Sequence, residues 1–423
     1  MEYSEEQKNI IQDQTNFMQV IAAAGSGKTS TMIGLLEKII LDKIEKQEEI
    51  LVITFTRKAT AELQERLDKK VGENLVRIQT FHAYCLYILQ KYKPEFINNR
   101  AEIIDESEKK KIFKEYFIKE KFKIGGIPYD LILSTNDSFL KSHFPEIFLE
   151  VNQIYKTYKK NKNKLDFDDL IQIYLSALEE NLPWAIEARR EVKRVIVDEF
   201  QDTDFNQLRW LQLLQPEKLC VVGDDWQAIY GFRGATTEPF LKFQSFFTPC
   251  KVHFLTSNYR SLKEIIQISA IPISKNKLNI KKKVKSVRVG KAKISRFTME
   301  SEEDLFYFKD LILESKEEVM ILCRSNYRIS YFKKIGIPEA NLITIHSSKG
   351  LEFDSVVVDL ISGWNLSTNE TRDVLEEERR ILYVALSRAK NKLMILGSAK
   401  KEDKKIESEF FSYFKLKVKK FAT

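Results

Sequence analysis

The segment AAAGSGKTS (residues 22–30) has the composition of a loop that binds phosphate. It lies between an apolar run and a helical pattern and matches the second half of G-x-x-x-x-G-K-[ST], with Ala22 at the first glycine position. Small residues let backbone N–H groups surround phosphates, while the lysine ammonium and the threonine hydroxyl serve the phosphates and Mg²⁺. A glycine-rich turn without function is the alternative, but the strand-to-helix context favours a nucleoside triphosphate site. We expect nucleotide contacts from Ala23, Ala24, Gly25, Ser26, Gly27, Lys28, Thr29 and Ser30.

A second apolar run, in VIVDEFQD (195–202), ends in two carboxylates. We expect Asp198 to hold Mg²⁺ together with Thr29, and Glu199 to act as the base or to position the attacking water. Acidic residues after a strand also serve as helix caps. Because this pair accompanies a phosphate loop, the metal and base roles are the stronger prediction.

The segment VVGDDWQAIYGFRGA (221–235) places carboxylates and a glutamine close to an aromatic–arginine group. Aromatic rings stack on nucleic-acid bases with about 1–3 kcal/mol per base and without sequence preference. Tyr230 and Phe232 could instead be core aromatics. Their spacing on an irregular loop beside Arg233 favours contact with a nucleic acid.

Nine short apolar runs, most of them rich in valine and isoleucine, are separated by helical patterns such as TSTMIGLLEKIILDKI (29–44). Nearly continuous apolar runs are typical of parallel strands buried on both faces, so the pattern predicts an α/β fold. Nine strands are too many for one small sheet, and we expect two sheets. Residues 101–162 read as charged helices without strands, which predicts a helical insert.

The bulk composition is that of a soluble protein with two or three domains in 423 residues. No run of eighteen apolar residues occurs, and the charged start MEYSEEQKNI is unlike a secretory signal, so we expect a cytoplasmic protein without a membrane partner. The four cysteines lack C-x-x-C spacing, which predicts buried reduced thiols rather than zinc ligands or disulfides.

The net charge is +8, and ten Lys or Arg residues with no Asp or Glu lie between Lys275 and Arg296. Such a run is either a solvated face or loop, or a surface that follows a phosphate backbone. Composition alone does not decide between the two.

Taken together, the motifs resemble those of the UvrD/Rep-type superfamily 1 helicases, in the family's order from Glu6 to Lys390. The remaining matching segments are EEQKNII (5–11), ITFTRKATAEL (53–63), IQTFHAY (78–84), LDFDDLI (165–171), LTSNYRS (255–261), ITIHSSKGLEF (343–353) and RRILYVALSRAK (379–390).

The resemblance implies two RecA-like parallel-sheet cores with ATP in the cleft between them. The first core would comprise residues 1–100 and 163–255, with a helical insert at 101–162, and the second residues 256–423. The large helical subdomain that relatives insert in the second core would be absent near residues 338–343, which implies a minimal motor.

The resemblance also implies residue roles. Gln7 and Tyr259 would hold the adenine, Glu352 the ribose, and Arg260 and Arg388 the γ-phosphate as arginine fingers. Asp224 and Gln227 would sense the γ-phosphate, so that 221–235 couples hydrolysis to DNA. The implied DNA contacts are Phe55, Thr56, Thr80, His82, Tyr230, Phe232, Arg233 and His346.

Some positions leave alternatives open. His82 could be a buried structural histidine and not a DNA contact. Arg260 and Arg388 could form exposed ion pairs and not contact the γ-phosphate. Arg57 and Trp226 stand where many relatives carry asparagine and aspartate.

Three functions follow as candidates. The first is a DNA-stimulated ATPase that moves 3′ to 5′ on single-stranded DNA and separates duplexes at junctions, its polarity implied by the resemblance alone. The second is a motor subunit of a repair, replication or phage-defence assembly with a nuclease or loader partner. The third is a nucleotide-switched DNA-binding module that does not move.

Overall fold

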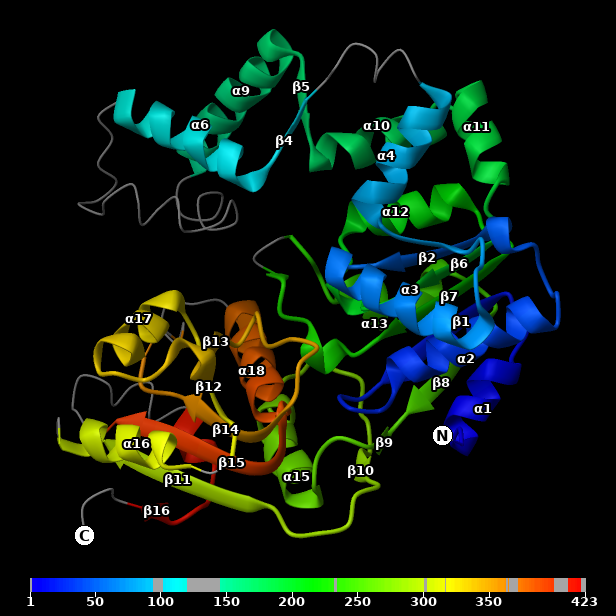
Figure 1. Cartoon of the computed structure of the whole chain (residues 1–423). Coiled ribbons are helices and arrows are strands. Elements are labelled where there is room, and N and C mark those ends of the chain that lie inside the picture. The colour runs from blue at the N-terminus through cyan, green and yellow to red at the C-terminus, as the bar shows by residue number, and fades with distance from the viewer. Residues whose placement is uncertain are drawn as a thin grey trace. The chain divides into compact units, whose positions relative to one another are not determined.

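Two six-stranded sheets flanked by helices form the framework of the chain (Figure 1). The computed structural model describes residues 2–93, 102–119, 145–231, 234–299, 303–315, 317–362, 364, 372–398 and 410–419. Both sheets confirm the predicted α/β fold class, and all nine predicted strands are present.

The first sheet has the strand order β3 (Arg77–Thr80), β2 (Ile50–Thr54), β6 (Arg194–Val197), β7 (Lys218–Gly223), β1 (Phe17–Ala22) and β8 (Cys250–Leu255). Strand β2 pairs in parallel with β3 and β6, and β6 with β7, in registers such as Ile53 opposite Val197. Every residue of β2 and β6 is buried, as expected for central parallel strands.

Three helices of this part begin at polar side chains that cap their first turns. Ser4, Asp166 and Asp204 each form a capping box with the residue three positions on. The helices of this part are α1 (Glu5–Gln12), α2 (Lys28–Leu41), α3 (Arg57–Val71), α4 (Phe81–Tyr92), α10 (Phe167–Glu179), α11 (Pro183–Arg190), α12 (Phe205–Leu214), α13 (Glu238–Leu241) and α14 (Phe243–Phe246), with 3-10 turns η1 (Gln47–Glu49) and η2 (Phe200–Asp202). A further 3-10 turn, η3 (Asp225–Gln227), follows β7.

The region predicted as a strandless helical insert contains helices α6 (Glu106–Lys119) and α9 (Pro145–Lys162). It also contains strand β4 (Glu102–Ile104), which pairs in parallel with β5 (Lys164–Asp166). The expectation of no strand in this region was therefore wrong. A three-residue strand is too short to produce a recognisable apolar run.

The second sheet has the order β13 (Leu342–Thr344), β12 (Val319–Cys323), β14 (Phe353–Asp359), β15 (Ala389–Ser398), β11 (Lys293–Met299) and β16 (Val418–Lys419), and all these neighbours are parallel. Helices α15 (Lys263–Ile273) and α18 (Arg372–Leu386) pack on one apolar core, and α16 (Glu303–Leu313) and α17 (Asn326–Lys334) on another. Further elements are β9 (Ser257–Asn258) paired with β10 (Lys285–Ser286), η5 (Glu339–Asn341) and η6 (Phe411–Tyr413).

Only residues 335–341, which include η5, connect α17 to β13. This short connection occupies the place where the resemblance expects a large helical subdomain. Its absence relative to the family pattern stays a prediction.

The contacts between Cα atoms divide the chain into two compact units. The first comprises residues 1–20, 29–223 and 230–253, and the second 21–28, 224–229 and 254–423. The phosphate loop and the loop after β7 therefore group with the second sheet's residues. The predicted core boundaries at residues 100, 163 and 255 stay predictions.

Three of the four cysteines are buried thiols, as expected, whereas Cys250 is only half-buried; all four are free. Among the described residues, no helix is both long and apolar enough to cross a membrane.

A buried ion pair ties α17 to the second sheet. Arg328 donates from Nε and Nη2 to the two carboxylate oxygens of Asp359 at 2.6 and 3.2 Å, and both side chains are almost fully buried. The Asp359→Asn variant keeps the side-chain shape but leaves the guanidinium without this counter-charge. We expect the free energy of unfolding to fall by about 3–5 kcal/mol in urea denaturation.

The matched control is Glu339→Gln. Glu339 forms an exposed ion pair with Lys333, which lies on α17 like Arg328. An exposed pair contributes at most about 1 kcal/mol. Equal losses in the two variants would contradict the argument from burial.

Candidate nucleotide and nucleic-acid site

The phosphate loop needs glycine at Gly25 for two reasons. Its φ angle is +67°, in the left-handed region. A Cβ atom at this position would also lie 2.6 Å from Cβ of Arg260. The loop backbone is thus closely approached by the segment that follows β8.

Asn258, which is not among the predicted site residues, organises this approach. Its side-chain amide donates to the carbonyl of Ala24 at 2.7 Å, and its side-chain oxygen accepts from the backbone N–H groups of Arg260 and Ser261 at 2.9 and 2.7 Å. The backbone N–H of Tyr259 donates to the carbonyl of Gly25 at 2.8 Å. Since Asn258 stands inside the quoted motif LTSNYRS, its position in the motif was the available signal.

Most of the remaining positions of the predicted phosphate loop are buried or half-buried. Ala23 and Ala24 are buried, and the buried Ser26 hydroxyl has no hydrogen-bond partner among the described residues. Lys28 opens helix α2, followed by Thr29 and Ser30 in its first turn. A buried hydroxyl without a protein partner fits a loop that receives a polar ligand.

Tyr383 of α18 lies against the same loop. Burial raises the pKa of its hydroxyl well above the usual value, and a hydrogen bond from the backbone N–H of Ala24 opposes that shift. Helix α18 therefore supports the loop from the second unit's own core.

Arg260, the first predicted arginine finger, forms an ion pair with Glu352, the predicted ribose contact. Arg260 Nε donates to Glu352 at 2.7 Å, and Lys390 Nζ lies 3.0 Å from the other carboxylate oxygen. Partial burial favours a raised pKa for Glu352, but hydrogen bonds from Arg260 and Lys390 outweigh it and lower the pKa. Tyr259 exposes 42% of its surface, as a stacking residue needs.

Arg388, the second predicted finger, is almost fully buried and well oriented. Its guanidinium donates to the carbonyls of Val384 and Leu351 at 3.0 and 3.1 Å and to the side-chain oxygen of Gln227 at 2.8 Å. Gln227 in turn donates to Asp224 at 2.6 Å. The residues that the resemblance implies for γ-phosphate sensing thus form one hydrogen-bonded chain.

Asp198 and Glu199 follow β6 in a strained turn. Glu199 has φ 50° and ψ 37°, the left-handed region that non-glycine residues rarely adopt. Its backbone N–H donates to Asp198 at 2.9 Å, and its carboxylate accepts from Gln201 at 2.6 Å. The turn holds both carboxylates in defined positions at the end of the strand.

Gln7, the predicted adenine contact, is buried in the first turn of α1. Its side-chain oxygen accepts from the backbone N–H of Ser4 at 3.0 Å in a capping box. The side chain is therefore held in one orientation, and its contact with adenine stays a prediction.

Phe55 and Tyr230 are brought together among the predicted DNA contacts. Their rings are nearly parallel, with centroids 6.1 Å apart and an interplanar angle of 10°. Phe232 and Arg233 lie outside the described residues. Arg57, beside this pair in sequence, is exposed in the first turn of α3.

Two predicted DNA-contacting hydroxyls have structural roles. Thr56 accepts from the backbone N–H of Ala59 at 3.1 Å, and Thr80 from that of Ala83 at 3.3 Å. They are the N-caps of α3 and α4. Their contact with DNA stays a prediction, and capping explains their residue type without it.

The two histidines differ in setting. His82 packs edge-on against Phe167 with ring centroids 5.6 Å apart, and burial lowers its pKa although nearby aspartates oppose the shift. The ring contact fits the structural alternative, and contact of His82 with DNA stays a prediction. His346 lies half-buried in the turns after β13.

Part of the basic stretch 275–296 has structural partners. Arg288 donates to the carbonyl of Arg260 at 2.6 Å, and Arg296 lies over the ring of Phe411 at 4.0 Å. Seven lysines of the stretch are exposed, and for them both alternatives stay open, a solvated face or a surface that follows a phosphate backbone. They are Lys275, Lys277, Lys281, Lys283, Lys285, Lys291 and Lys293.

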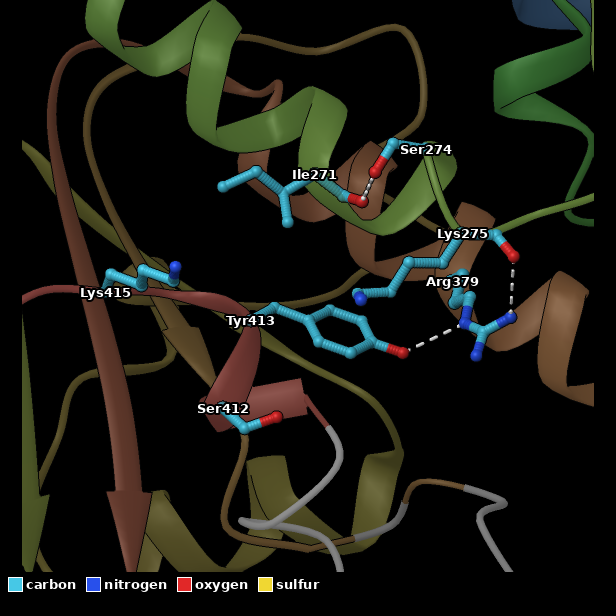
Figure 2. A pocket seen from close by; sticks show the side chains of 7 residues that line it. All are labelled: Ile271, Ser274, Lys275, Arg379, Ser412, Tyr413 and Lys415. Carbon is cyan, nitrogen blue, oxygen red and sulfur yellow. Dashed lines mark hydrogen bonds between the residues drawn. The ribbon is translucent and has the colours of Figure 1, made fainter.

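An open hollow of about 710 Å³ adjoins the start of this stretch (Figure 2). Lys275 Nζ lies 4.8 Å from the ring centroid of Tyr413, and Arg379 donates to the Tyr413 hydroxyl at 2.9 Å and to the carbonyl of Lys275 at 3.3 Å. These cations link η6 to α18 and to the residues that follow α15, which accounts for their presence without a ligand. The lining residues are Ile271, Ser274, Lys275, Arg379, Ser412, Tyr413 and Lys415.

Comparison with known families and proteins gives consistent matches. Residues 3–248 match the UvrD/REP helicase N-terminal domain, and residues 332–400 match the UvrD-like helicase C-terminal domain. The ATP-dependent DNA helicase Rep of Buchnera aphidicola subsp. Baizongia pistaciae is 30% identical over 358 residues, which are 79% of this chain and 53% of that protein. The ATP-dependent DNA helicases PcrA of Staphylococcus epidermidis and Staphylococcus aureus are 28% and 27% identical over 403 and 400 residues, 87% of this chain and 54% of theirs. The chain spans about half the length of these relatives.

Proposed function

Because the chain belongs to the UvrD/REP helicase family, we propose that it is an ATP-driven motor that translocates 3′ to 5′ along single-stranded DNA and separates duplex strands at junctions. The observation that carries the proposal is the hydrogen-bonded chain from Arg388 through Gln227 to Asp224. It joins a guanidinium that can stabilise developing charge to an amide that can orient water. A nucleotide-switched binding module would need no such arrangement.

The proposed chemistry is phosphoryl transfer from ATP to water. Lys28 and the loop N–H groups bind the phosphates, and Glu199 accepts the proton of the attacking water or orients it. Arg260 and Arg388 stabilise the charge on the equatorial oxygens in the transition state. Tyr259 stacks on the adenine, with Gln7 contacting its edge.

The proposed metal is Mg²⁺, held by the Thr29 hydroxyl and the Asp198 carboxylate. Both are hard oxygen donors, which Mg²⁺ prefers, and nucleotide phosphates and water supply its remaining ligands. Within the described residues no cluster of three histidine, cysteine or acidic side chains could hold a metal. Bound Mg²⁺ would neutralise phosphate charge.

The proposed coupling of ATP to DNA runs through residues 221–235. Gln227 belongs to the phosphate-sensing chain, and Tyr230, three residues on, stacks with Phe55. A shift of the loop with nucleotide state would therefore move an aromatic group that can contact a base.

The protein acts in the cytoplasm in this proposal. A nuclease or loader partner is the second candidate, which the short 335–341 connection favours if duplex contacts come from elsewhere.

The deciding experiment measures ATP hydrolysis with and without single-stranded DNA for wild-type protein, Lys28→Ala and Phe232→Ala. We expect strong stimulation by DNA, loss of turnover in Lys28→Ala and blunted stimulation in Phe232→Ala. Lys38→Ala is the matched control, because Lys38 lies on the same helix and pairs with Asp42 at the surface.

The outcome then separates the candidates. Turnover indifferent to DNA would contradict the coupled motor. Stimulated turnover without movement in a single-strand translocation assay would contradict the motor and favour the switched module. Directional movement without unwinding would favour a subunit that needs its partner.

A further inference from the structure

One lysine of the basic stretch is completely withdrawn from solvent. The side chain of Lys282 is 0% exposed, and its ammonium contacts Asp224 and lies 2.7 Å from Asp225. The same ammonium lies 4.7 Å from the ring centroid of Trp226. Neither a solvated face nor a phosphate-following surface describes this residue.

Burying an ammonium is costly unless it is paired, and here one ammonium serves two neighbouring carboxylates. Burial raises the pKa of Asp225, and repulsion from Asp224 adds to the shift, while Lys282 opposes it. Without Lys282, these two neighbouring carboxylates would lose the buried ammonium that contacts both of them.

The contact with Asp224 continues into the proposed active site. Asp224 uses one carboxylate oxygen for Lys282 and the other for the side-chain amide of Gln227, which donates to it at 2.6 Å. An amide whose NH₂ points to a carboxylate must turn its oxygen the other way. That oxygen accepts from Arg388 at 2.8 Å.

The backbone before Lys282 fixes the same loop. The N–H of Ile280 donates to Asp225 at 2.8 Å, and the indole N–H of Trp226 donates to the carbonyl of Ile280 at 3.0 Å. Trp226 also packs edge-on against Tyr383 at 5.4 Å. This gives Trp226, where many relatives carry aspartate, a definite role, since it locks residues 280–282 to the loop.

We propose that Lys282 is a positioning residue for ATP hydrolysis, which orients the Gln227 amide toward the γ-phosphate and Arg388 by holding Asp224. The inference rests on the proposed function, because it assumes that Gln227 meets the nucleotide. It assigns a role to a residue ten positions or more from any of the phosphate-sensing motifs.

The test compares variants in a background that keeps the buried charge balanced. Asp225→Asn removes one carboxylate and leaves the Lys282–Asp224 contact. Asp225→Asn with Lys282→Met removes one charge of each sign relative to wild type. The two exposed neighbours supply matched controls, Lys281→Met and Lys283→Met.

We expect Asp225→Asn to keep kcat close to that of wild type at saturating single-stranded DNA. Adding Lys282→Met should lower kcat roughly 10- to 100-fold, as loss of an orienting partner does, with KM for ATP changed less than about threefold. The controls should keep the wild-type kcat. If the double variant retains the kcat of Asp225→Asn, Lys282 serves only to balance buried charge and the inference is wrong.

A binding measurement separates failure of this inference from failure of the proposed function. The quantity to measure is the Kd for ADP divided by the Kd for a non-hydrolysable ATP analogue. A correctly oriented Gln227 should raise this ratio, because only the ATP analogue carries a γ-phosphate group for it to contact. A drop in this ratio on adding Lys282→Met supports the inference even if wild-type protein hydrolyses no ATP. An unchanged ratio overturns the inference even if wild-type protein is an active motor.

Discussion

Replacing Arg388 by alanine is expected to lower kcat for ATP hydrolysis by about 10³- to 10⁵-fold, the range for loss of an arginine finger. The guanidinium is held by the carbonyls of Val384 and Leu351, so it needs little reorganisation to meet developing charge. The measurement is steady-state turnover at saturating ATP and single-stranded DNA. Binding of a non-hydrolysable ATP analogue should fall far less than kcat, because the charge that Arg388 is proposed to stabilise develops in the transition state.

Arg388 is almost fully buried, so its loss also affects folding, and the experiment must separate the two effects. Arg388→Lys retains the charge but not the planar fork, and we expect it to remain folded yet nearly as slow as the alanine variant. Arg372→Ala on the same helix is the control, since Arg372 pairs with Glu376 at the surface end of its side chain. A lysine variant with wild-type kcat would contradict the finger and support a purely structural arginine.

Most of the strands that sequence periodicity predicted are buried on both faces, whereas β8 and β13 are only partly buried. Strands β2 and β14 are dense in valine and isoleucine, so their pattern is visible without tertiary information. Strands β3, RIQT, and β11, KISRFTM, were not predicted because charged and polar residues interrupt them. Their pairing depends on neighbours distant in sequence.

The residues of the candidate site also fall into two groups, those that local sequence could predict and those that only the fold reveals. Residues inside motifs, such as Lys28 and Arg388, could be proposed from local sequence because the motif itself encodes the chemistry. Lys282 could not, since three consecutive lysines at 281–283 look alike in sequence and only the fold buries the middle one. Its partners lie 57 and 58 residues away along the chain.

The structure also shows protein partners for residues whose type fitted a functional role, and their functional contacts stay predictions. Thr56 and Thr80 are helix N-caps, a role that local sequence would equally have predicted. Glu352 and Arg260, predicted to contact different parts of the nucleotide, are paired with each other. For both to reach ATP, this ion pair must open or share its groups with the ligand.

The second large effect is expected for Glu199→Gln, which should lower kcat by about 10²- to 10⁴-fold, the usual contribution of a general base. The glutamine keeps the size of the side chain and can still bond to Gln201, which donates to Glu199 at 2.6 Å. It cannot accept a proton from water. We therefore expect little change in the affinity for an ATP analogue, in contrast to Lys28→Ala.

The backbone at Glu199 provides a second, independent readout. Its φ of 50° is strained for any residue except glycine, asparagine or aspartate. The glutamate side chain therefore costs conformational free energy at a backbone position that favours glycine. Glu199→Gly should relieve that strain and unfold at a temperature no lower than that of wild type, while losing kcat like the glutamine variant. Glu179→Gln, an exposed carboxylate paired with Arg209, is the control for charge alone. Full activity of both Glu199 variants would show that the strained turn serves the fold, and the base would have to be sought elsewhere.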